Sequence, residues 1–203
     1  MPTLRQIRLC WKPLAFTAAL LPLLGLLAGA AGLGGARLGP NPVETIQDTS
    51  GLWALRLLLV TLCVTPLRWA TGQAWPLQFR RMLGLFAFAY AALHFANYLL
   101  LDRALDAGEI TGDLTRRPYI IIGFVALLLL AALAATSTAG WRRRLGQRWQ
   151  ALHQAIYPAG LLACWHFWWQ VKKDHTAPLW YCVILLALLG LRAWRARWQP
   201  PPG

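Results

Sequence analysis

Three histidines in apolar surroundings, His94, His153 and His166, are the residues of this sequence most suited to chemistry. His94 lies in Arg80–Asp102, where about twenty residues with almost no charge separate two arginines from an aspartate. At about 1.5 Å per residue, such a helix is long enough to cross about 30 Å of hydrocarbon. An ionisable side chain at that depth costs free energy, and neutral imidazole binds metals. His94 is therefore a candidate metal ligand, and the alternative is a histidine hydrogen-bonded to a neighbouring helix.

His166 lies in a second long apolar stretch, Trp149–Val171. If both stretches run from the cytoplasm outward, His94 and His166 each lie about 9–12 Å inside the outer end of their helix. Imidazoles at one depth can face each other when their helices are neighbours. Axial ligation of a haem iron requires two such histidines, and helix bundles commonly host these sites. The pattern predicts a haem bound by His94 and His166.

His153 belongs to the same stretch as His166 but lies about 20 Å lower, near the cytoplasmic face. On an ideal helix the two side chains point about 140° apart, although Pro158 can bend the segment. The residue at the matching level below His94 is Arg80, which cannot be an axial ligand. One haem is therefore expected. For His153 the open roles are binding a quinone or flavin, pairing with a haem propionate, or a place at the membrane interface.

The composition indicates that membrane-spanning helices position these histidines. The chain has 203 residues, of which 58% are hydrophobic, with twelve tryptophans. These values are typical of a polytopic membrane protein. We expect an all-α, six-helix transmembrane bundle that forms a single domain over residues 1–203. The expected spans are residues 14–33, 51–69, 82–101, 119–136, 149–171 and 179–194, with loops at 34–50, 102–117 and 137–148.

The first apolar stretch also has features of a signal peptide, with a basic start and small residues at its end. It is longer than the core of a typical signal, which favours a retained helix. In either case the N-terminus is cytoplasmic.

The charge distribution supports this orientation. The net charge of +13 comes from short basic clusters between apolar stretches. Most lysines and arginines fall on the cytoplasmic side, and all seven acidic residues fall on the other side. The positive-inside rule therefore explains the charge, and no nucleic-acid partner is expected. Arg56, a few residues into the second span, is expected to extend to the outer surface.

Several other kinds of site are absent from the sequence. The four cysteines include no pair at CxxC spacing, so they form neither a zinc site nor a disulfide framework. Without a CxxCH motif, any haem is not covalently attached. No phosphate-binding glycine loop, Ser/His/Asp arrangement or paired carboxylate occurs in the apolar stretches. A haem-free transporter or scaffold with structural histidines is the alternative from another class.

Three blocks of the sequence resemble one known family. The blocks are RRMLGLFAFAYAALHFANYLLLD, TRRPYIIIGFVALLLLAALAATS and RRLGQRWQALHQAIYPAGLLACWHFWWQVK. Together they resemble the MsrQ family, formerly called YedZ, the haem-binding membrane subunits of the bacterial MsrPQ protein-methionine-sulfoxide reductase system. The likeness covers about residues 50–195 and includes a ferric-reductase-like core.

This resemblance implies a particular haem arrangement. The ferric-reductase-like group, shared with NADPH oxidases, includes members with two histidines on each of two helices and two stacked haems. His94 and His166 match the outer pair, whereas His153 matches one inner ligand whose partner position is Arg80. One b-type haem follows from this match, and a second would lack a ligand.

The resemblance also implies partners and a location. Electrons would come from the quinone pool or a cytosolic flavin reductase and pass through haem to MsrP, a periplasmic molybdopterin subunit. MsrP reduces methionine sulfoxide in oxidised periplasmic proteins, so this chain would be a bacterial inner-membrane electron-transfer subunit without a substrate-reducing site. FMN is implied by the resemblance alone. The alternative in the same class is a quinol-linked b-type cytochrome that serves another periplasmic acceptor.

Overall fold

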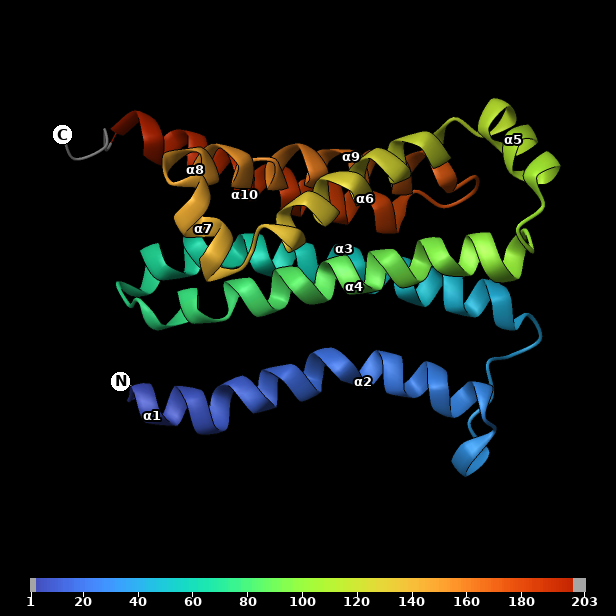
Figure 1. The fold of residues 1–203 in the computed structure, drawn as a ribbon, viewed down its shortest axis with the longest axis horizontal. Coiled ribbons are helices and arrows are strands. Elements are labelled where there is room, and N and C mark those ends of the chain that lie inside the picture. The colour runs from blue at the N-terminus through green and yellow to red at the C-terminus, as the bar shows by residue number, and fades with distance from the viewer. Residues whose placement is uncertain (1–2, 199–203) are drawn as a thin grey trace.

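The chain folds into a bundle of helices, as the computed structural model of residues 3–198 shows (Figure 1). Within these residues no strand occurs, which confirms the expected all-α class. The elements in chain order are α1 (Leu4–Gln6), η1 (Ile7–Trp11), α2 (Lys12–Ala30), η2 (Leu33–Gly35), α3 (Pro42–Thr71), η3 (Trp75–Gln78), α4 (Arg80–Asn97), η4 (Tyr98–Asp102), α5 (Ala107–Arg116), α6 (Tyr119–Ala135), α7 (Ala139–Leu145), α8 (Gln147–His153), α9 (Ile156–Gln170) and α10 (Thr176–Trp198).

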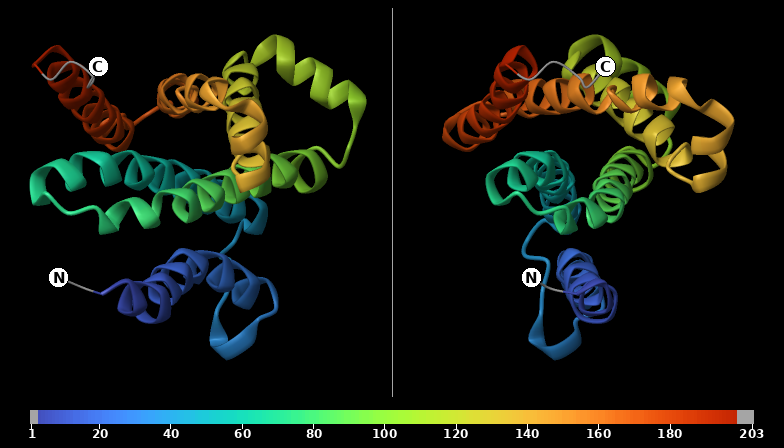
Figure 2. Two further views of the ribbon diagram at one scale, coloured as in Figure 1. Left: turned by 60° about the vertical axis from the view of Figure 1, so that its left-hand side comes forward. Right: turned by 90° about the vertical axis from the view of Figure 1, so that its left-hand side faces the viewer.

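The long helices lie side by side and alternate in direction along the bundle (Figure 1). α3 and α4 pair in the middle, with α2 on one side and α6, α9 and α10 on the other (Figures 1 and 2). Leucines of α3, including Leu58 and Leu62, are almost completely buried where these layers meet. α3 is therefore the central helix of the packing.

Within residues 3–198, four helices are long and apolar enough to cross a membrane: Leu4–Ala31, Pro42–Thr71, Arg80–Asp102 and Thr176–Trp198. A fifth is possible if α5 and α6, whose axes differ by 104°, are counted together. The chain is thus a multi-pass membrane protein. The number of six spans and the cytoplasmic N-terminus stay predictions.

The expected span 149–171 is not one continuous helix, because α8 ends at His153 and α9 begins at Ile156. Pro158 explains the break: it has no N–H for the carbonyl of Gln154, and its ring crowds that carbonyl. The Gln154 carbonyl accepts instead from the N–H of Tyr157 at 3.0 Å. The break places His153 and His166 on separate helices.

The three stretches expected to be loops contain helices, so those expectations were wrong. α3 begins at Pro42, well inside the expected loop 34–50, because Asn41 accepts a hydrogen bond from the N–H of Glu44 at 3.3 Å and proline suits a first turn. α5 lies in 102–117 and is capped by Asp106, and α7 lies in 137–148 and is capped by Thr138. Side-chain caps start all three helices.

Two arginines inside the bundle tie α3 to α10. Pro66 lies within α3 and leaves the carbonyl of Leu62 without its usual helical donor. Arg192 Nη2 donates to that carbonyl. Arg56 Nε donates to the hydroxyl of Tyr181 at 2.8 Å, so this side chain bonds to α10 instead of extending freely to the outer surface.

A tyrosine of α4 hydrogen-bonds to the backbone of the N-terminal helix α2, and Phe16 of α2 also contacts Phe86 of α4 at a centroid distance of 5.0 Å. Tyr90, which is 3% exposed, donates its hydroxyl to the carbonyl of Ala19 at 2.8 Å and accepts from the N–H of Leu23 at 3.0 Å. These two backbone groups lie in the turn of α2 around Pro22. The contact is specific for α4 against α2.

We expect Tyr90→Phe to weaken the attachment of α2. Removing the hydroxyl eliminates two interhelical hydrogen bonds, and the free energy of unfolding should fall by about 1 kcal/mol. Thermal unfolding of the detergent-purified protein measures this loss. Tyr119→Phe is the matched control, because the Tyr119 hydroxyl makes no hydrogen bond to the residues that the structure describes. Equal melting temperatures for the two variants would contradict the role of Tyr90.

Candidate functional site

The structure brings His94 and His166 together. His94 lies on α4 and His166 on α9, and both rings are partly buried between the helices. The ring centroids are 6.1 Å apart, and the ring planes are nearly perpendicular, at 89°. Two imidazoles that are 72 residues apart in the chain therefore meet inside the bundle.

In each imidazole, the Nδ1 atom is hydrogen-bonded to a backbone carbonyl oxygen of a neighbouring helix. His94 Nδ1 lies 2.9 Å from the carbonyl oxygen of Gln47 on α3, and His166 Nδ1 lies 2.7 Å from that of Tyr119 on α6. A carbonyl oxygen only accepts hydrogen bonds, so both neutral rings carry their proton on Nδ1. The lone pair is then on Nε2 in both histidines, which is the tautomer that a metal requires at that atom.

Each ring packs against a glycine. That glycine lies one helical turn after the residue whose carbonyl oxygen is hydrogen-bonded to the ring. A Cβ atom at Gly51 would lie 2.8 Å from His94 Nδ1, and one at Gly123 would lie 2.7 Å from His166 Nδ1. Real Cβ atoms essentially never come so close to a neighbouring atom. The same local arrangement, a carbonyl at one position and a glycine four residues later, thus fixes both rings.

His94 and His166 are the two residues that would hold a haem in this bundle. Two imidazoles that bind one metal through Nε2 from opposite sides, at about 2 Å each, have centroids about 6 Å apart. The observed separation agrees, and both Nδ1 atoms are already hydrogen-bonded in the manner that orients metal-binding histidines. Iron bound by porphyrin needs only two protein ligands, which is the number present here.

His153 is not part of this pair. It ends α8, where its Nε2 lies 3.2 Å from the hydroxyl of Thr136 and its ring stacks on Trp149 at a centroid distance of 3.9 Å. The Thr136 hydroxyl already donates to Ala132, so it accepts from His153 Nε2. His153 thus has a polar neighbourhood of its own at the other end of the bundle.

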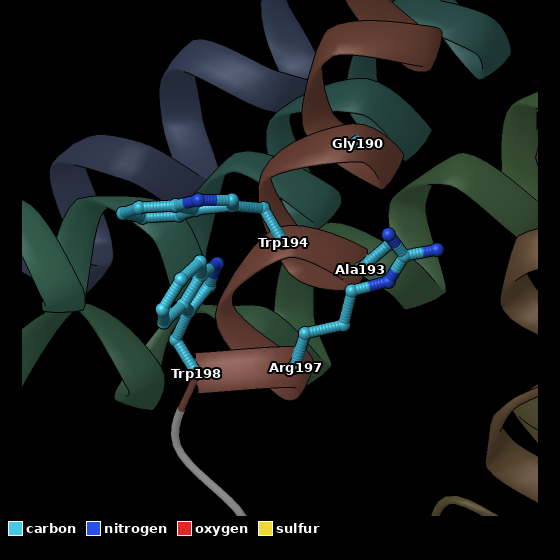
Figure 3. Close-up of a pocket in the computed structure, with 5 residues that line it drawn as sticks. All are labelled: Gly190, Ala193, Trp194, Arg197 and Trp198. Atoms are coloured by element: carbon cyan, nitrogen blue, oxygen red, sulfur yellow. The ribbon is translucent and has the colours of Figure 1, made fainter.

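A shallow pocket on α10 lies apart from all three of these histidines. Gly190, Ala193, Trp194, Arg197 and Trp198 line it, and the two indoles project to the side of the helix away from Arg197 (Figure 3). Tryptophan and arginine at the end of an apolar helix are typical of a membrane interface. This pocket is therefore not the candidate site.

The sequence analysis missed the residues that hold the two rings, above all Gln47, Gly51 and Gly123. Gln47 was placed in a loop because the start of α3 was set too late. Asn41, Pro42 and Glu44 carried a usable signal, since a capping residue, a first-turn proline and an early acidic residue mark a helix start. Nothing in the sequence alone marked the two glycines, because their role depends on which helix packs against them.

Comparison with known proteins points to one family. The sequence model of the ferric reductase like transmembrane component family matches residues 50–164. The chain is 50% identical to a protein of Xanthomonas euvesicatoria pv. vesicatoria, over 94% of this chain and 93% of that protein. It is 52% identical to one of Xanthomonas campestris pv. campestris (83% and 81%) and 49% identical to one of Bordetella pertussis (92% and 91%). All three are named protein-methionine-sulfoxide reductase heme-binding subunit MsrQ.

The fold, the histidine pair and the family match define a membrane component of the ferric-reductase-like class. Within this class, the chain is about 50% identical to the MsrQ proteins over almost its whole length. The chain therefore belongs to the MsrQ family.

Proposed function

We propose that this chain binds one b-type haem through His94 and His166 and carries electrons across the bacterial inner membrane to a periplasmic molybdopterin methionine-sulfoxide reductase, MsrP. The observation that carries the proposal is the 6.1 Å separation of two imidazoles with matching tautomers. The names of the relatives, which describe them as haem-binding subunits of protein-methionine-sulfoxide reductase, support it. The chain itself would reduce no substrate.

A b-type haem supplies a one-electron couple within the membrane. The residues of this chain orient the two imidazoles and set their tautomers. The carbonyls of Gln47 and Tyr119 fix the Nδ1 protons and raise the basicity of both Nε2 atoms. Because Gly51 and Gly123 have no Cβ atom, they leave the space that the two rings occupy.

The proposed direction of electron flow follows from the proposed topology. With six passes and a cytoplasmic N-terminus, His153 and Arg80 lie toward the cytoplasm and the histidine pair lies toward the periplasm. The donor would then be the quinone pool or a cytosolic flavin reductase acting at the His153 end. FMN belongs to this proposal only through the family resemblance.

We expect His153→Ala to retain the haem but to be reduced several-fold more slowly from the cytoplasmic side. His153 lies apart from the histidine pair and bonds to Thr136 and Trp149, so its loss should leave the iron ligands in place. Stopped-flow reduction of the haem with a quinol and with a flavin reductase measures the effect. His175→Ala, at an exposed position beyond α9, is the control. Reduction rates equal to the control with both donors would make His153 a structural residue.

The acidic segment around α5 is proposed to face MsrP. Asp113 is not available for docking, because it is 7% exposed and bonds to Arg103 at 2.6 Å and to Arg117 at 3.4 Å. Asp102, Asp106 and Glu109 are exposed. Within this segment the proposed docking carboxylates are therefore Asp106, Glu109 and Asp102, the last of which also pairs with Arg103 at 3.6 Å.

Reconstitution tests the proposed function. The purified chain in liposomes, with a quinol or flavin reductase as donor and the molybdopterin subunit outside, should reduce methionine sulfoxide in a test protein, and its haem should be reoxidised by that subunit. His94→Ala should give no activity. Haem that other acceptors reoxidise, but not the molybdopterin subunit, would favour the quinol-linked cytochrome. Protein made with ample haem that shows no Soret band would favour a haem-free transporter or scaffold.

A further inference from the structure

Gln47 contacts both ring nitrogens of His94. Its backbone carbonyl lies 2.9 Å from Nδ1, and its side-chain Nε2 lies 3.2 Å from the ring Nε2. Because the carbonyl fixes the proton on Nδ1, the ring Nε2 accepts and the amide donates. The Gln47 side chain therefore occupies the ring atom that the proposed haem iron needs. His166 has no equivalent contact among the described residues.

Asn97 lies on the other side of the Gln47 amide. It is one turn beyond His94 on α4, 3% exposed, and its Nδ2 donates to Gln47 Oε1 at 2.6 Å and to the carbonyl of Val43 at 3.1 Å. The two acceptors identify this atom as the amide nitrogen, so the other terminal atom is the oxygen. That oxygen, Oδ1, is buried and has no hydrogen-bond partner in residues 3–198. A buried acceptor without a partner is costly and calls for an explanation.

We propose that Gln47 is a positioning residue with two alternative partners. In the metal-free pair its amide donates to His94 Nε2. With His94 Nε2 engaged in holding a haem, the Gln47 amide would turn and donate to Asn97 Oδ1. Gln47 Oε1 keeps its bond from Asn97 Nδ2, so the two side chains form a reciprocal amide pair.

Three features of the structure carry this inference. Val43, Gln47 and Gly51 are spaced four residues apart on one face of α3, opposite His94 and Asn97, which are three apart on α4. The Gln47 amide already contacts both residues, because its Nε2 lies 3.2 Å from His94 Nε2 and its Oε1 accepts from Asn97 Nδ2 at 2.6 Å. The unpaired Oδ1 is the acceptor that the displaced amide requires. The amide pair would then brace α3 against α4 beside the ligated ring.

Haem exchange in the full-length, detergent-purified protein tests this inference, which rests on the proposed haem site. Haem release into excess apomyoglobin should be about 10-fold faster for Gln47→Leu and for Asn97→Leu than for the unchanged protein. The double variant should also release haem about 10-fold faster, because the two side chains act as one unit. Exposed Gln150 on α8 provides the matched control, Gln150→Leu, with an unchanged rate.

Haem uptake separates positioning from a general loss of packing. Gln47→Leu keeps the backbone carbonyl but removes the donor that competes for His94 Nε2, so it should take up haem about 5-fold faster than the unchanged protein. Asn97→Leu keeps that donor, so it should not take up haem faster than the unchanged protein. If the leucine variants fail to fold, Gln47→Asn retains a polar side chain too short to bridge His94 and Asn97, and it should show the same two changes.

The outcomes distinguish this inference from the proposed function. Three results would each overturn the role of Gln47 while leaving the haem site in place. The single variants could release haem at a rate within 2-fold of the unchanged protein, or the double variant could release it at a rate that multiplies the two single effects. The third result is slower haem uptake by Gln47→Leu than by the unchanged protein. Full haem retention by His94→Ala would instead overturn the haem site itself.

Discussion

Replacing His94 or His166 with alanine is expected to abolish stable haem binding. In the proposed site each imidazole supplies one of only two protein ligands, and the two ring centroids are 6.1 Å apart. No other histidine lies at the pair, because His153 bonds to Thr136 elsewhere in the bundle. Loss of one ligand should lower haem affinity by at least about 100-fold, since even the groups that orient ligands are worth 10- to 100-fold.

The measurement is haem content per chain after purification from cells supplied with excess haem precursor. His175→Ala is the matched control, because His175 is exposed and stacks on Trp168 outside the pair. It should retain the full haem content. A full complement of low-spin haem in either ligand variant would rule out that residue as an axial ligand.

The second large effect is expected from a single methyl group added beside each ring. Gly51→Ala and Gly123→Ala place Cβ atoms at 2.8 and 2.7 Å from the Nδ1 atoms of His94 and His166. The ring must move, and the hydrogen bond from Nδ1 to the carbonyl one turn earlier must lengthen. Haem affinity should fall by about 10- to 100-fold in each variant.

In a helix, alanine is more stable than glycine by about 1 kcal/mol, so neither substitution should weaken its own helix. A loss of haem therefore cannot come from a weaker helix. Gly84→Ala, on the same helix as His94, is the control, since the nearest atom to its Cβ would be 3.7 Å away, an ordinary contact. Wild-type haem affinity in Gly51→Ala and Gly123→Ala would show that the two glycines do not set the ring positions.

The sequence was sufficient for the class of fold and for the three candidate histidines, because both depend on local features. Apolar stretches of helical length identify membrane helices, and an ionisable residue inside one is conspicuous. Counting residues from the helix ends placed His94 and His166 at one depth, and the structure brings these two rings together. The resemblance to the MsrQ family was confirmed by relatives that match most of the chain.

The errors came from local signals that hydropathy does not contain. A cap at Asn41 moved the start of α3 to Pro42 and thereby brought Gln47 to His94. The missing N–H of Pro158 divided the stretch 149–171 into α8 and α9. The fit of His94 over Gly51 depends on how α3 and α4 pack, which no spacing within one helix determines.

The most direct test of the central claim is the haem iron content per chain of the detergent-purified protein, with reduced-minus-oxidised spectra of the same sample. The His94–His166 site predicts one low-spin b-type haem per chain. Protein without haem would contradict the site, and two haems per chain would contradict the assignment of His153 as a residue that does not ligate iron.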